Sequence, residues 1–277
     1  MLILENFVAA SWLFKHLDDG DVTVLDCRFD LFDPSYGKVA YKKSHIKNAF
    51  YLDMNEDLSA PKKEHGGSRP VPDLYLFKKK LENIGISNDT TIVIYDEHLD
   101  GAPRLWWLLK YLGHDKTYIL NGCMEEWSKQ GYPVTKNIPK ANNKGEYSIK
   151  VNKDLYCDID YVKTKKDKEN VILIDSRGYE RYSGENEPLY AKAGHVPGAI
   201  NYPWQKNLQN NFFKEKEVLE KDFEEIIKYE EIIFYCGSGI AACVNCLALA
   251  EIGMQSKVYI GSFSDWISYE ENLVATV

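Results

Sequence analysis

The sequence repeats one pattern in its two halves, and this repeat limits what the 277-residue chain can fold into. Four short segments of the first half recur in the same order in the second half, at offsets of 149, 150, 140 and 139 residues. Offsets that drift only by loop-sized amounts indicate duplication of one domain rather than a solenoid of short repeats. The paired segments are 24–28 and 173–177, 44–46 and 194–196, 94–96 and 234–236, and 122–127 and 261–266.

Within each copy, short β-branched runs alternate with helical patterns, which predicts an α/β fold with a mostly parallel sheet flanked by helices. The stretch 136–150 is rich in Asn and Lys and has no clear period, so it is the predicted linker between domains 1–135 and 151–277. The expected strands are 22–25, 91–95, 117–120, 171–174, 231–235 and 257–260, and the expected helices are 74–84, 105–112, 221–228 and 241–252.

Composition and charge exclude several classes of protein. A net charge of -8 opposes binding to nucleic acids and to anionic membranes. The longest apolar run, residues 240–250, is far shorter than a membrane span. Six cysteines are too few for a disulfide scaffold, and the first residues lack the basic start of a secretory signal. We therefore expect a cytoplasmic protein without a nucleic-acid or membrane partner.

The loop that begins at Cys236 is the strongest candidate for chemistry. It follows the expected strand 231–235 and precedes the expected helix 241–252, at the strand end where parallel sheets collect ligands. Gly237 and Gly239 let the backbone curl so that several N–H groups face one anion, and the helix dipole adds positive charge there. We expect this environment to favour the thiolate form of Cys236 and to make it a nucleophile.

These motifs together resemble the tandem-domain rhodanese sulfurtransferases, over nearly the whole chain. The resemblance lies in the loop Cys-Gly-Ser-Gly-Ile-Ala-Ala at 236–242, in the paired Asp-x-Arg and His-x-x-x-Ala segments, and in the segments that end at Trp127 and Trp266. In that family the second copy carries the catalytic cysteine, and here Asp96 stands at the matching position of the first copy. The resemblance implies that Cys236 takes sulfane sulfur from a small anionic donor as a persulfide. It then passes the sulfur to cyanide, a small thiol or thioredoxin, without a metal or cofactor.

The resemblance also implies how the donor is held. Ser238, with Asp53 and His65, matches a proposed proton relay in which the histidine protonates the enolate left by a pyruvate donor. The alternative for His65 is a solvated loop histidine. A second donor-binding arginine, expected before Gly194, is absent. The other residues implied to contact the donor are Arg181, Gly237, Gly239, Ile240, Ala241 and Ala242.

The loop sequence leaves the donor open. Gly237 and Ser238 favour 3-mercaptopyruvate, because similar proteins that prefer thiosulfate carry Arg and Lys there. Ile240 and Ala241 replace a Val-Thr pair, so thiosulfate stays an alternative. The loop ends in Ala242 rather than the arginine of related phosphatases, which argues against phosphoryl transfer. A persulfide carrier or redox-sensing module that turns over no small donor is the other open function.

The remaining repeated residues have structural interpretations. His45 and His195 recur in both copies, including the copy without a nucleophile, which indicates a shared structural contact. Arg177 has a counterpart in Arg28, so both are expected to form salt bridges within their strand motifs. The two cysteines of the last long helix lack the spacing of zinc ligands, and helix packing is expected for them.

Overall fold

The computed structural model describes residues 4–277 and divides them into two compact units. The first unit comprises residues 4–60, 71–152 and 210–213, and the second comprises 61–70, 153–209 and 214–277. The stretch 136–150 thus lies within the first unit, whereas 61–70 packs with the second. The domain limits drawn from the sequence stay a prediction, and the structure groups these segments differently.

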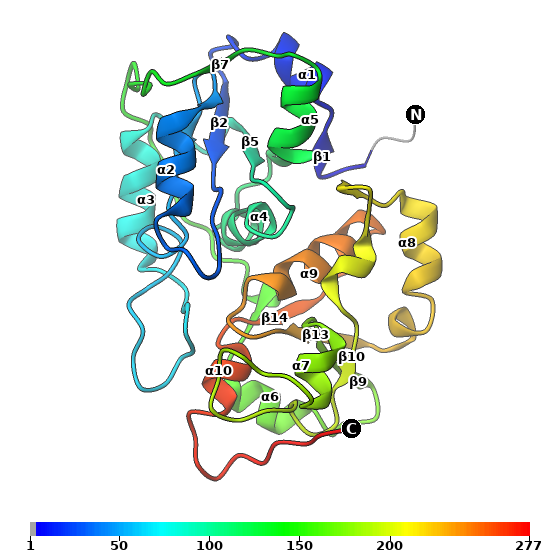
Figure 1. Cartoon of the computed structure of the whole chain (residues 1–277). Helices are drawn as coiled ribbons and strands as arrows, with labels where there is room; N and C mark the ends of the chain where they lie inside the picture. Colours follow the sequence, from blue (N-terminus) through cyan, green and yellow to red (C-terminus); the bar gives the residue numbers. More distant parts are fainter. Residues whose placement is uncertain (1–3) are drawn as a thin grey trace. The chain divides into compact units, whose positions relative to one another are not determined.

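The first unit is built on a parallel five-stranded sheet with the order β1-β6-β5-β2-β4 (Figure 1). Strand β5, Thr-Ile-Val-Ile-Tyr, is almost wholly buried, as is typical of a parallel strand covered on both faces. A short antiparallel pair, β3 with β7, completes the unit. The strands are β1 Phe7–Val8, β2 Val22–Asp26, β3 His45–Ile46, β4 Phe50–Tyr51, β5 Thr91–Tyr95, β6 Thr117–Leu120, β7 Val134–Thr135 and β12 Phe212–Phe213, and the helices are α1 Ala10–Lys15, α2 Tyr36–Lys43, α3 Leu74–Asn83, α4 Ala102–Tyr111 and α5 Cys123–Lys129.

The second unit repeats this sheet with the order β10-β9-β13-β14-β8, again with parallel pairs. Helix α9 packs on β13 and β14, as can be followed in Figure 1. The strands are β8 Tyr156–Cys157, β9 Val171–Asp175, β10 Ile200–Asn201, β11 Leu208–Gln209, β13 Glu231–Tyr235 and β14 Lys257–Tyr259; the helices are α6 Ile159–Lys165, α7 Tyr179–Ser183, α8 Lys216–Asp222, α9 Ala241–Glu251 and α10 Ser262–Trp266, with 3-10 turns η1 Lys153–Leu155, η2 Trp204–Asn207 and η3 Ile226–Lys228.

The two central strand pairs have the same register, which confirms the predicted α/β fold and its duplication. In the first unit β2 pairs with β5 so that Asp26 lies opposite Tyr95. In the second, β9 pairs with β13 so that Asp175 lies opposite Tyr235. One predicted helix, 221–228, is wrong: α8 ends at Asp222 and a turn leads into η3. Apolar residues three or four apart suit α and 3-10 turns alike, so the pattern did not distinguish them.

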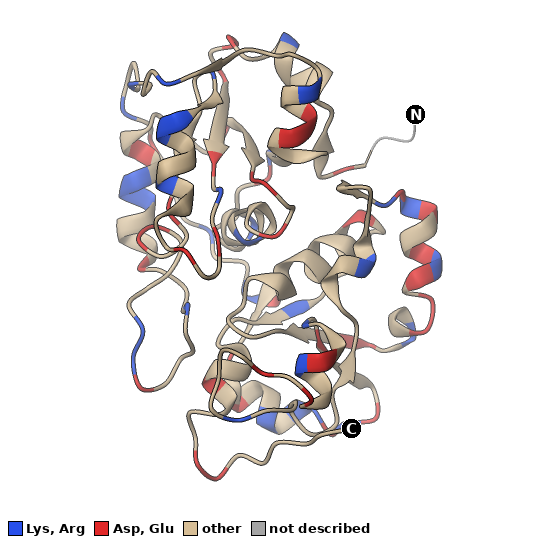
Figure 2. Ribbon diagram, viewed as in Figure 1, with Lys and Arg blue, Asp and Glu red and all other residues tan. Residues whose placement is uncertain are grey.

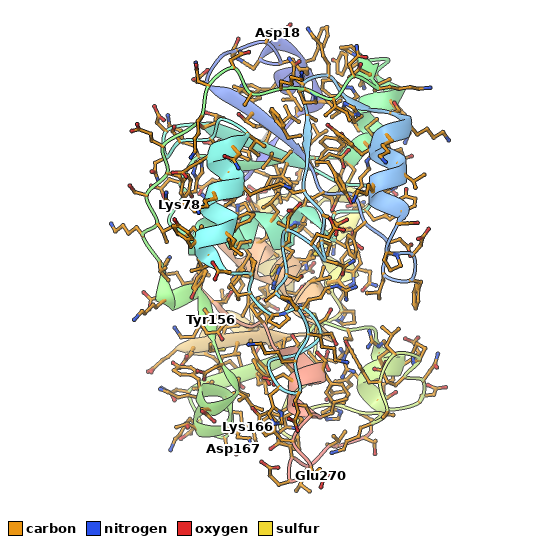
Figure 3. All side chains as sticks on the ribbon, turned by 90° about the vertical axis from the view of Figure 1, so that its left-hand side faces the viewer. Asp18, Lys78, Tyr156, Lys166, Asp167 and Glu270 are labelled. Carbon is orange, nitrogen blue, oxygen red and sulfur yellow. The ribbon has the colours of Figure 1, made fainter. Side chains whose placement is uncertain are left out.

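Helix α9 is buried around nearly its whole circumference. From Ala242 to Leu249 every residue is buried, and Glu251 is the helix's single charged residue. Figure 2 shows α9 almost entirely without charge, whereas α8 carries side chains of both signs. Exposed carboxylates such as Asp18 and Asp167 lie at the edge of the view in Figure 3. Within residues 4–277 no helix combines the length and apolar character that a membrane crossing needs.

The repeated Asp-x-Arg motifs form matching buried ion pairs, as predicted. Arg28 Nη2 lies 2.7 Å from Asp26 Oδ2 and donates to the Ser44 carbonyl at 2.7 Å. Arg177 donates through Nε and Nη2 to the carboxylate of the second copy's aspartate, and through Nη2 to the Gly194 carbonyl at 2.7 Å. Each arginine therefore ties the end of a central strand to the segment that follows.

The repeated histidines also have the predicted structural contact. His45 stacks on Tyr41 with ring centroids 3.9 Å apart, and its Nδ1 lies 2.7 Å from the Tyr41 carbonyl oxygen. His195 stacks on Tyr182 at 3.9 Å, with Nδ1 2.8 Å from the carbonyl oxygen of that tyrosine. The same contact in both units confirms that these histidines serve the fold.

Candidate active site

Strand β13 places Cys236 directly after its last residue, where the side chain is only 2% exposed. The backbone N–H of Cys236 donates to Ser262 Oγ at 3.1 Å, and its carbonyl accepts from the Phe263 N–H at 3.0 Å. Ser262 Oγ also lies 4.0 Å from Cys236 Sγ. The first turn of α10 therefore fixes the cysteine at the carboxyl edge of the sheet.

The two glycines of the loop both lie against neighbouring groups, and the contact is strict at Gly239. The Gly239 N–H donates to Cys236 Sγ at 3.2 Å, and Gly239 has φ +76°. A Cβ at Gly239 would lie 2.4 Å from the Ile260 carbonyl oxygen, so only glycine fits there. A Cβ at Gly237 would lie 3.1 Å from Tyr190 Oη and 3.2 Å from Arg181 Nη2, which places both side chains against the loop.

The rest of the loop forms the beginning of α9. Ile240 is the N-cap residue, and Ala241 and Ala242 open the first turn. The N–H groups of a first helical turn have no partner within the helix, and the helix dipole makes this end positive. The loop residues predicted to hold the donor thus form this positive helix end, and the Gly239 N–H is the backbone donor recorded at Cys236 Sγ.

Ser238 has a neighbour that the sequence did not indicate. Arg69 Nη1 lies 3.3 Å from Ser238 Oγ, and the serine is buried. Burial lowers the pKa of Arg69, while Tyr190 and Cys236 act in the opposite direction. A guanidinium stays protonated at neutral pH even so. The structure therefore places a cation beside Ser238 and close to the cysteine.

The segment 61–70 is attached to α10 by backbone contacts. The Gly66 N–H donates to Asp265 Oδ1 at 2.7 Å, and the Ser68 N–H donates to Ser264 Oγ at 2.9 Å. Gly67 has φ +87°, and a Cβ there would lie 2.3 Å from the Gly261 carbonyl oxygen. Gly67 therefore lets the segment approach the backbone at Gly261, directly before the α10 residues that hold Cys236.

The structure does not join His65 to Ser238. His65 is exposed, its Nδ1 lies 2.8 Å from Ser268 Oγ, and its ring stacks on Tyr269 with centroids 4.0 Å apart. The histidine precedes Gly66 and the arginine follows Ser68, so a few residues separate the predicted partner of Ser238 from the one observed. The Gly-Gly pair followed by an arginine was the available signal, but its meaning depends on the fold of the segment.

Asp53 belongs to the first unit, where its carboxylate organises a local turn. Oδ1 accepts from the N–H groups of Asn55 and Glu56 at 2.8 and 3.0 Å, and Oδ2 accepts from Tyr51 Oη at 3.1 Å. These contacts give Asp53 a structural role. Its membership of a proton relay stays a prediction.

Arg181 lies against Gly237, but its charge is already paired. Its Nε and Nη2 lie 3.0 and 2.9 Å from the two carboxylate oxygens of Glu187. The same Glu187 accepts from Arg177 Nη1 at 2.9 Å, and its side chain is 1% exposed. The predicted donor clamp is thus one part of a buried ion-pair network.

The other thiols of the second unit lie outside the loop between β13 and α9. Burial raises the pKa of Cys246 to about 11 and raises that of Cys157 well above its usual range. Cys243 Sγ donates to the Gly239 carbonyl at 3.3 Å. Between residues 4 and 277 no group of three or more His, Cys, Asp or Glu side chains is arranged to hold a metal ion.

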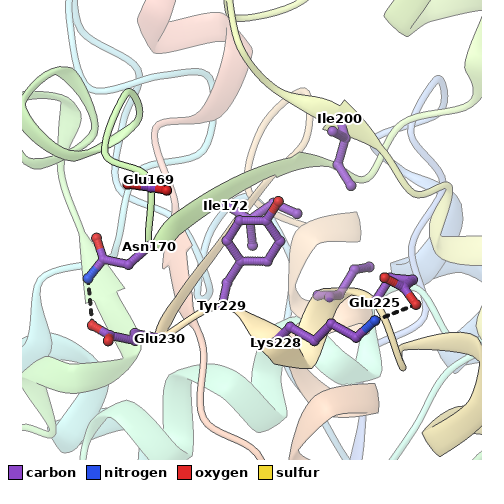
Figure 4. A pocket seen from close by; sticks show the side chains of 9 residues that line it. Glu169, Asn170, Ile172, Ile200, Glu225, Lys228, Tyr229 and Glu230 are labelled. Carbon is purple, nitrogen blue, oxygen red and sulfur yellow. Dashed lines mark hydrogen bonds and ion pairs between the residues drawn. The ribbon is translucent and has the colours of Figure 1, made fainter.

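A cavity of about 740 Å³ lies elsewhere in the second unit, at the amino ends of β9 and β13 (Figure 4). Two contacts tie polar groups of its lining together: Lys228 pairs with Glu225 at 2.6 Å, and Asn170 donates to Glu230 at 2.5 Å. Cys236 lies at the opposite, carboxyl end of β13, where parallel sheets bind their ligands. The cavity is therefore separate from the candidate active site.

A parallel α/β unit with a cysteine between a strand and a helix, and a backbone N–H donating to its sulfur, is typical of a cysteine-dependent enzyme. Comparison with known proteins agrees with this class. The Rhodanese-like domain matches residues 9–130 and 158–269, and the chain belongs to this family.

Relatives that cover nearly the whole chain narrow the class to sulfurtransferases. The chain is 35% identical to a probable 3-mercaptopyruvate sulfurtransferase of Pseudomonas aeruginosa, over 98% of each chain. It is 30% identical to a thiosulfate sulfurtransferase of Rattus norvegicus, over 96% of this chain and 93% of that one. The solved structure of SseA from Escherichia coli, a 3-mercaptopyruvate sulfotransferase, matches with a TM-score of 0.79 at 28% identity, over 93% of this chain and 98% of that one. The chain is a sulfurtransferase with two rhodanese-like domains.

Proposed function

We propose that Cys236 carries a sulfane sulfur, as a persulfide, from 3-mercaptopyruvate or thiosulfate to a thiophilic acceptor. The observation that carries this proposal is the 3.2 Å hydrogen bond from the Gly239 N–H to Cys236 Sγ. An N–H that points at the sulfur stabilises negative charge on it, as the attacking thiolate and the persulfide both require.

Each half of the proposed reaction exchanges one bond to sulfur. The Cys236 thiolate attacks the terminal sulfur of the donor, and a new S–S bond forms. The donor's bond to that sulfur breaks, and its electron pair leaves on sulfite or on the pyruvate enolate, which then takes a proton. In the second half an acceptor thiolate or cyanide attacks the outer sulfur, and the thiolate of Cys236 is restored.

The matching loop of the first unit supports a place for the outer sulfur. There Asp96 Oδ2 accepts from the N–H groups of Gly101 and Ala102 at 2.8 and 2.7 Å. The residues at the same offset in the second unit are Ala241 and Ala242. We assign their N–H groups to the outer sulfur of the persulfide.

The remaining assignments belong to the same proposal. Ser238 contacts the donor through its hydroxyl, and Arg181 contacts it at the edge of the loop beside Gly237. The acceptor is thioredoxin or a small thiol, and the reaction takes place in the cytoplasm. The cysteines support a reducing compartment, since within residues 4–277 all six are thiols and none forms a disulfide.

The test is to load the protein with sulfur and weigh it. Wild type and Cys236→Ser are exposed to each donor, and the intact mass is recorded before and after cyanide is added. We expect wild type alone to gain one sulfur, about 32 Da, and to lose it as thiocyanate with turnover. The faster donor identifies the preferred substrate.

Two outcomes would contradict the proposal. If Cys236→Ser also gains the sulfur, another thiol is the acceptor site. If wild type gains none from either donor but takes sulfur from a protein persulfide, the chain is a carrier rather than an enzyme for small donors.

A further inference from the structure

A cation beside Ser238, supplied by a distant stretch of the sequence, is the feature that the proposed function leaves unused. Arg69 Nη1 lies 3.3 Å from Ser238 Oγ, two residues beyond the nucleophile. The arginine is half-buried; burial lowers its pKa, and the neighbouring Tyr190 and Cys236 act against that shift. A guanidinium in such a place binds carboxylate or sulfonate through charge-assisted hydrogen bonds.

The nearby Arg181 is a weaker candidate for this role. Its Nε and Nη2 both donate to the carboxylate of Glu187, at 3.0 and 2.9 Å. The carboxylate of Glu187 is 1% exposed and also binds Arg177, so the three side chains form one buried ion-pair network. To bind a donor anion, Arg181 would have to share its charge with a buried carboxylate, which reduces its attraction for a second anion.

The position of Arg69 is fixed by its segment rather than by its own side chain. The N–H groups of Gly66 and Ser68 bind side chains of α10, and Gly67 lies against Gly261. Ser262, the next residue of α10, binds the N–H of Cys236. One short helix therefore positions both the nucleophile and the cation, as a preorganised anion site requires.

We propose that Arg69 binds the anionic group of the sulfur donor, the carboxylate of 3-mercaptopyruvate or the sulfonate of thiosulfate. The inference rests on the proposed function, because it assigns a part of the same reaction. Arg69 then supplies the second donor-binding cation that the sequence lacks before Gly194. It also stands where an imidazole proton donor was predicted, and a guanidinium gives up no proton at neutral pH.

The test compares Arg69→Gln with Arg69→Lys, and uses Lys63→Gln as the matched control. Lys63 is exposed in the same segment, so its substitution removes a charge without changing the site. Steady-state kinetics with both donors are measured for each variant. We expect Arg69→Gln to raise KM roughly 10- to 100-fold with a smaller change in kcat, Arg69→Lys to recover part of the loss, and the control to match wild type.

A second measurement reports the charge at the site without any donor. Cys236 is alkylated with iodoacetate, which is an anion, and with neutral iodoacetamide, and modification of that residue is followed by peptide mass. We expect Arg69→Gln to lower the ratio of the two rates roughly tenfold, because only the anion is attracted by the guanidinium. A merely structural role would slow both reagents equally.

The outcomes separate this inference from the proposed function. If wild type takes sulfur from neither donor, the proposed function fails, and the alkylation ratio still decides whether Arg69 makes an anion site. If Arg69→Gln leaves KM for both donors and the alkylation ratio unchanged, the inference is overturned. A rise in KM with one donor alone identifies the anion that the arginine binds.

Discussion

The loops that follow β5 and β13 occupy the same place in their units, but they differ in their first residue. The carboxylate of Asp96 accepts hydrogen bonds from the first loop, whereas the second loop begins with the thiol of Cys236. Asp96 Oδ1 accepts from the Leu99 N–H at 2.9 Å, as Cys236 Sγ accepts from the Gly239 N–H at 3.2 Å. Leu99 and Gly239 both have positive φ, 57° and 76°. The backbone conformation is thus preserved although the residue types differ.

The difference lies in what satisfies the backbone donors. The carboxylate of Asp96 has two oxygens and accepts from three N–H groups, those of Leu99, Gly101 and Ala102. Cys236 offers a single sulfur atom at the same point. The difference teaches that this loop conformation suits an anion. In the proposed function, a persulfide occupies for part of each cycle the place that the carboxylate of Asp96 occupies permanently.

The largest expected effect comes from copying the first loop into the second. Cys236→Asp should lower sulfur transfer more than about a thousandfold, because a carboxylate carries no sulfane sulfur and fills the loop. It should also be more stable than Cys236→Ser by about 1–3 kcal/mol, because the new carboxylate accepts charge-assisted hydrogen bonds. Urea denaturation and donor turnover measure both effects.

Equal stability of Cys236→Asp and Cys236→Ser would break the comparison. It would mean that the amides of the second loop do not converge on one anion as those around Asp96 do.

The reverse change removes the carboxylate from the first loop. Asp96→Ala should destabilise that unit by about 3 kcal/mol, because three buried N–H groups lose their acceptor. Asp89→Ala, which removes an exposed carboxylate just before β5, should change stability by less than about 0.5 kcal/mol. Hydrogen exchange of peptides spanning 91–112 measures both variants, and equal protection in the two would contradict the role given to Asp96.

A smaller expected effect is a pH dependence of the stability of the first unit, caused by Asp100 in the loop after β5. Burial, followed by the charge of Asp96, raises the pKa of Asp100 to about 7. Since this folded-state value lies above the unfolded value, Asp100 favours folding below about pH 4 and loses that contribution as pH rises through 7. Asp100→Asn should therefore stabilise the first unit by roughly 1–3 kcal/mol at pH 8 and by much less at pH 5.

Thermal melts of Asp100→Asn at the two pH values measure the effect. A gain that is the same at pH 5 and pH 8 would exclude titration of Asp100 as its cause. In Asp96→Asn the pH dependence should shrink, because the neighbouring charge is gone.

The fold was largely predictable because its signals are local. The runs at 91–95 and 231–235 are mainly apolar, each after a polar first residue, and they became β5 and β13 with the predicted limits. The helix predicted at 221–228 failed because apolar spacing alone does not separate an α turn from the 3-10 turn that follows α8.

The candidate site was likewise predictable where its residues are neighbours in the sequence, and not where they come from distant segments. The Cys236 loop is one continuous segment, so its glycines and the following helix could be interpreted from the sequence. The partner of Ser238 could not, because Arg69 comes from far along the chain and is placed by the contacts of Gly66 and Ser68 with α10. The pairing of Arg181 with Glu187 depends equally on how the chain after α7 folds back.

Residues 61–70 lie in the first half of the sequence but belong to the second unit, so the chain cannot be cut between its two repeats without dividing that unit. A fragment that starts at residue 151 contains Cys236 and its entire loop, yet it lacks the ten residues that cover Gly261 and carry Arg69. The duplicated halves are therefore no longer interchangeable modules. Recombination that moves the second half alone transfers Cys236 and leaves part of its surroundings behind.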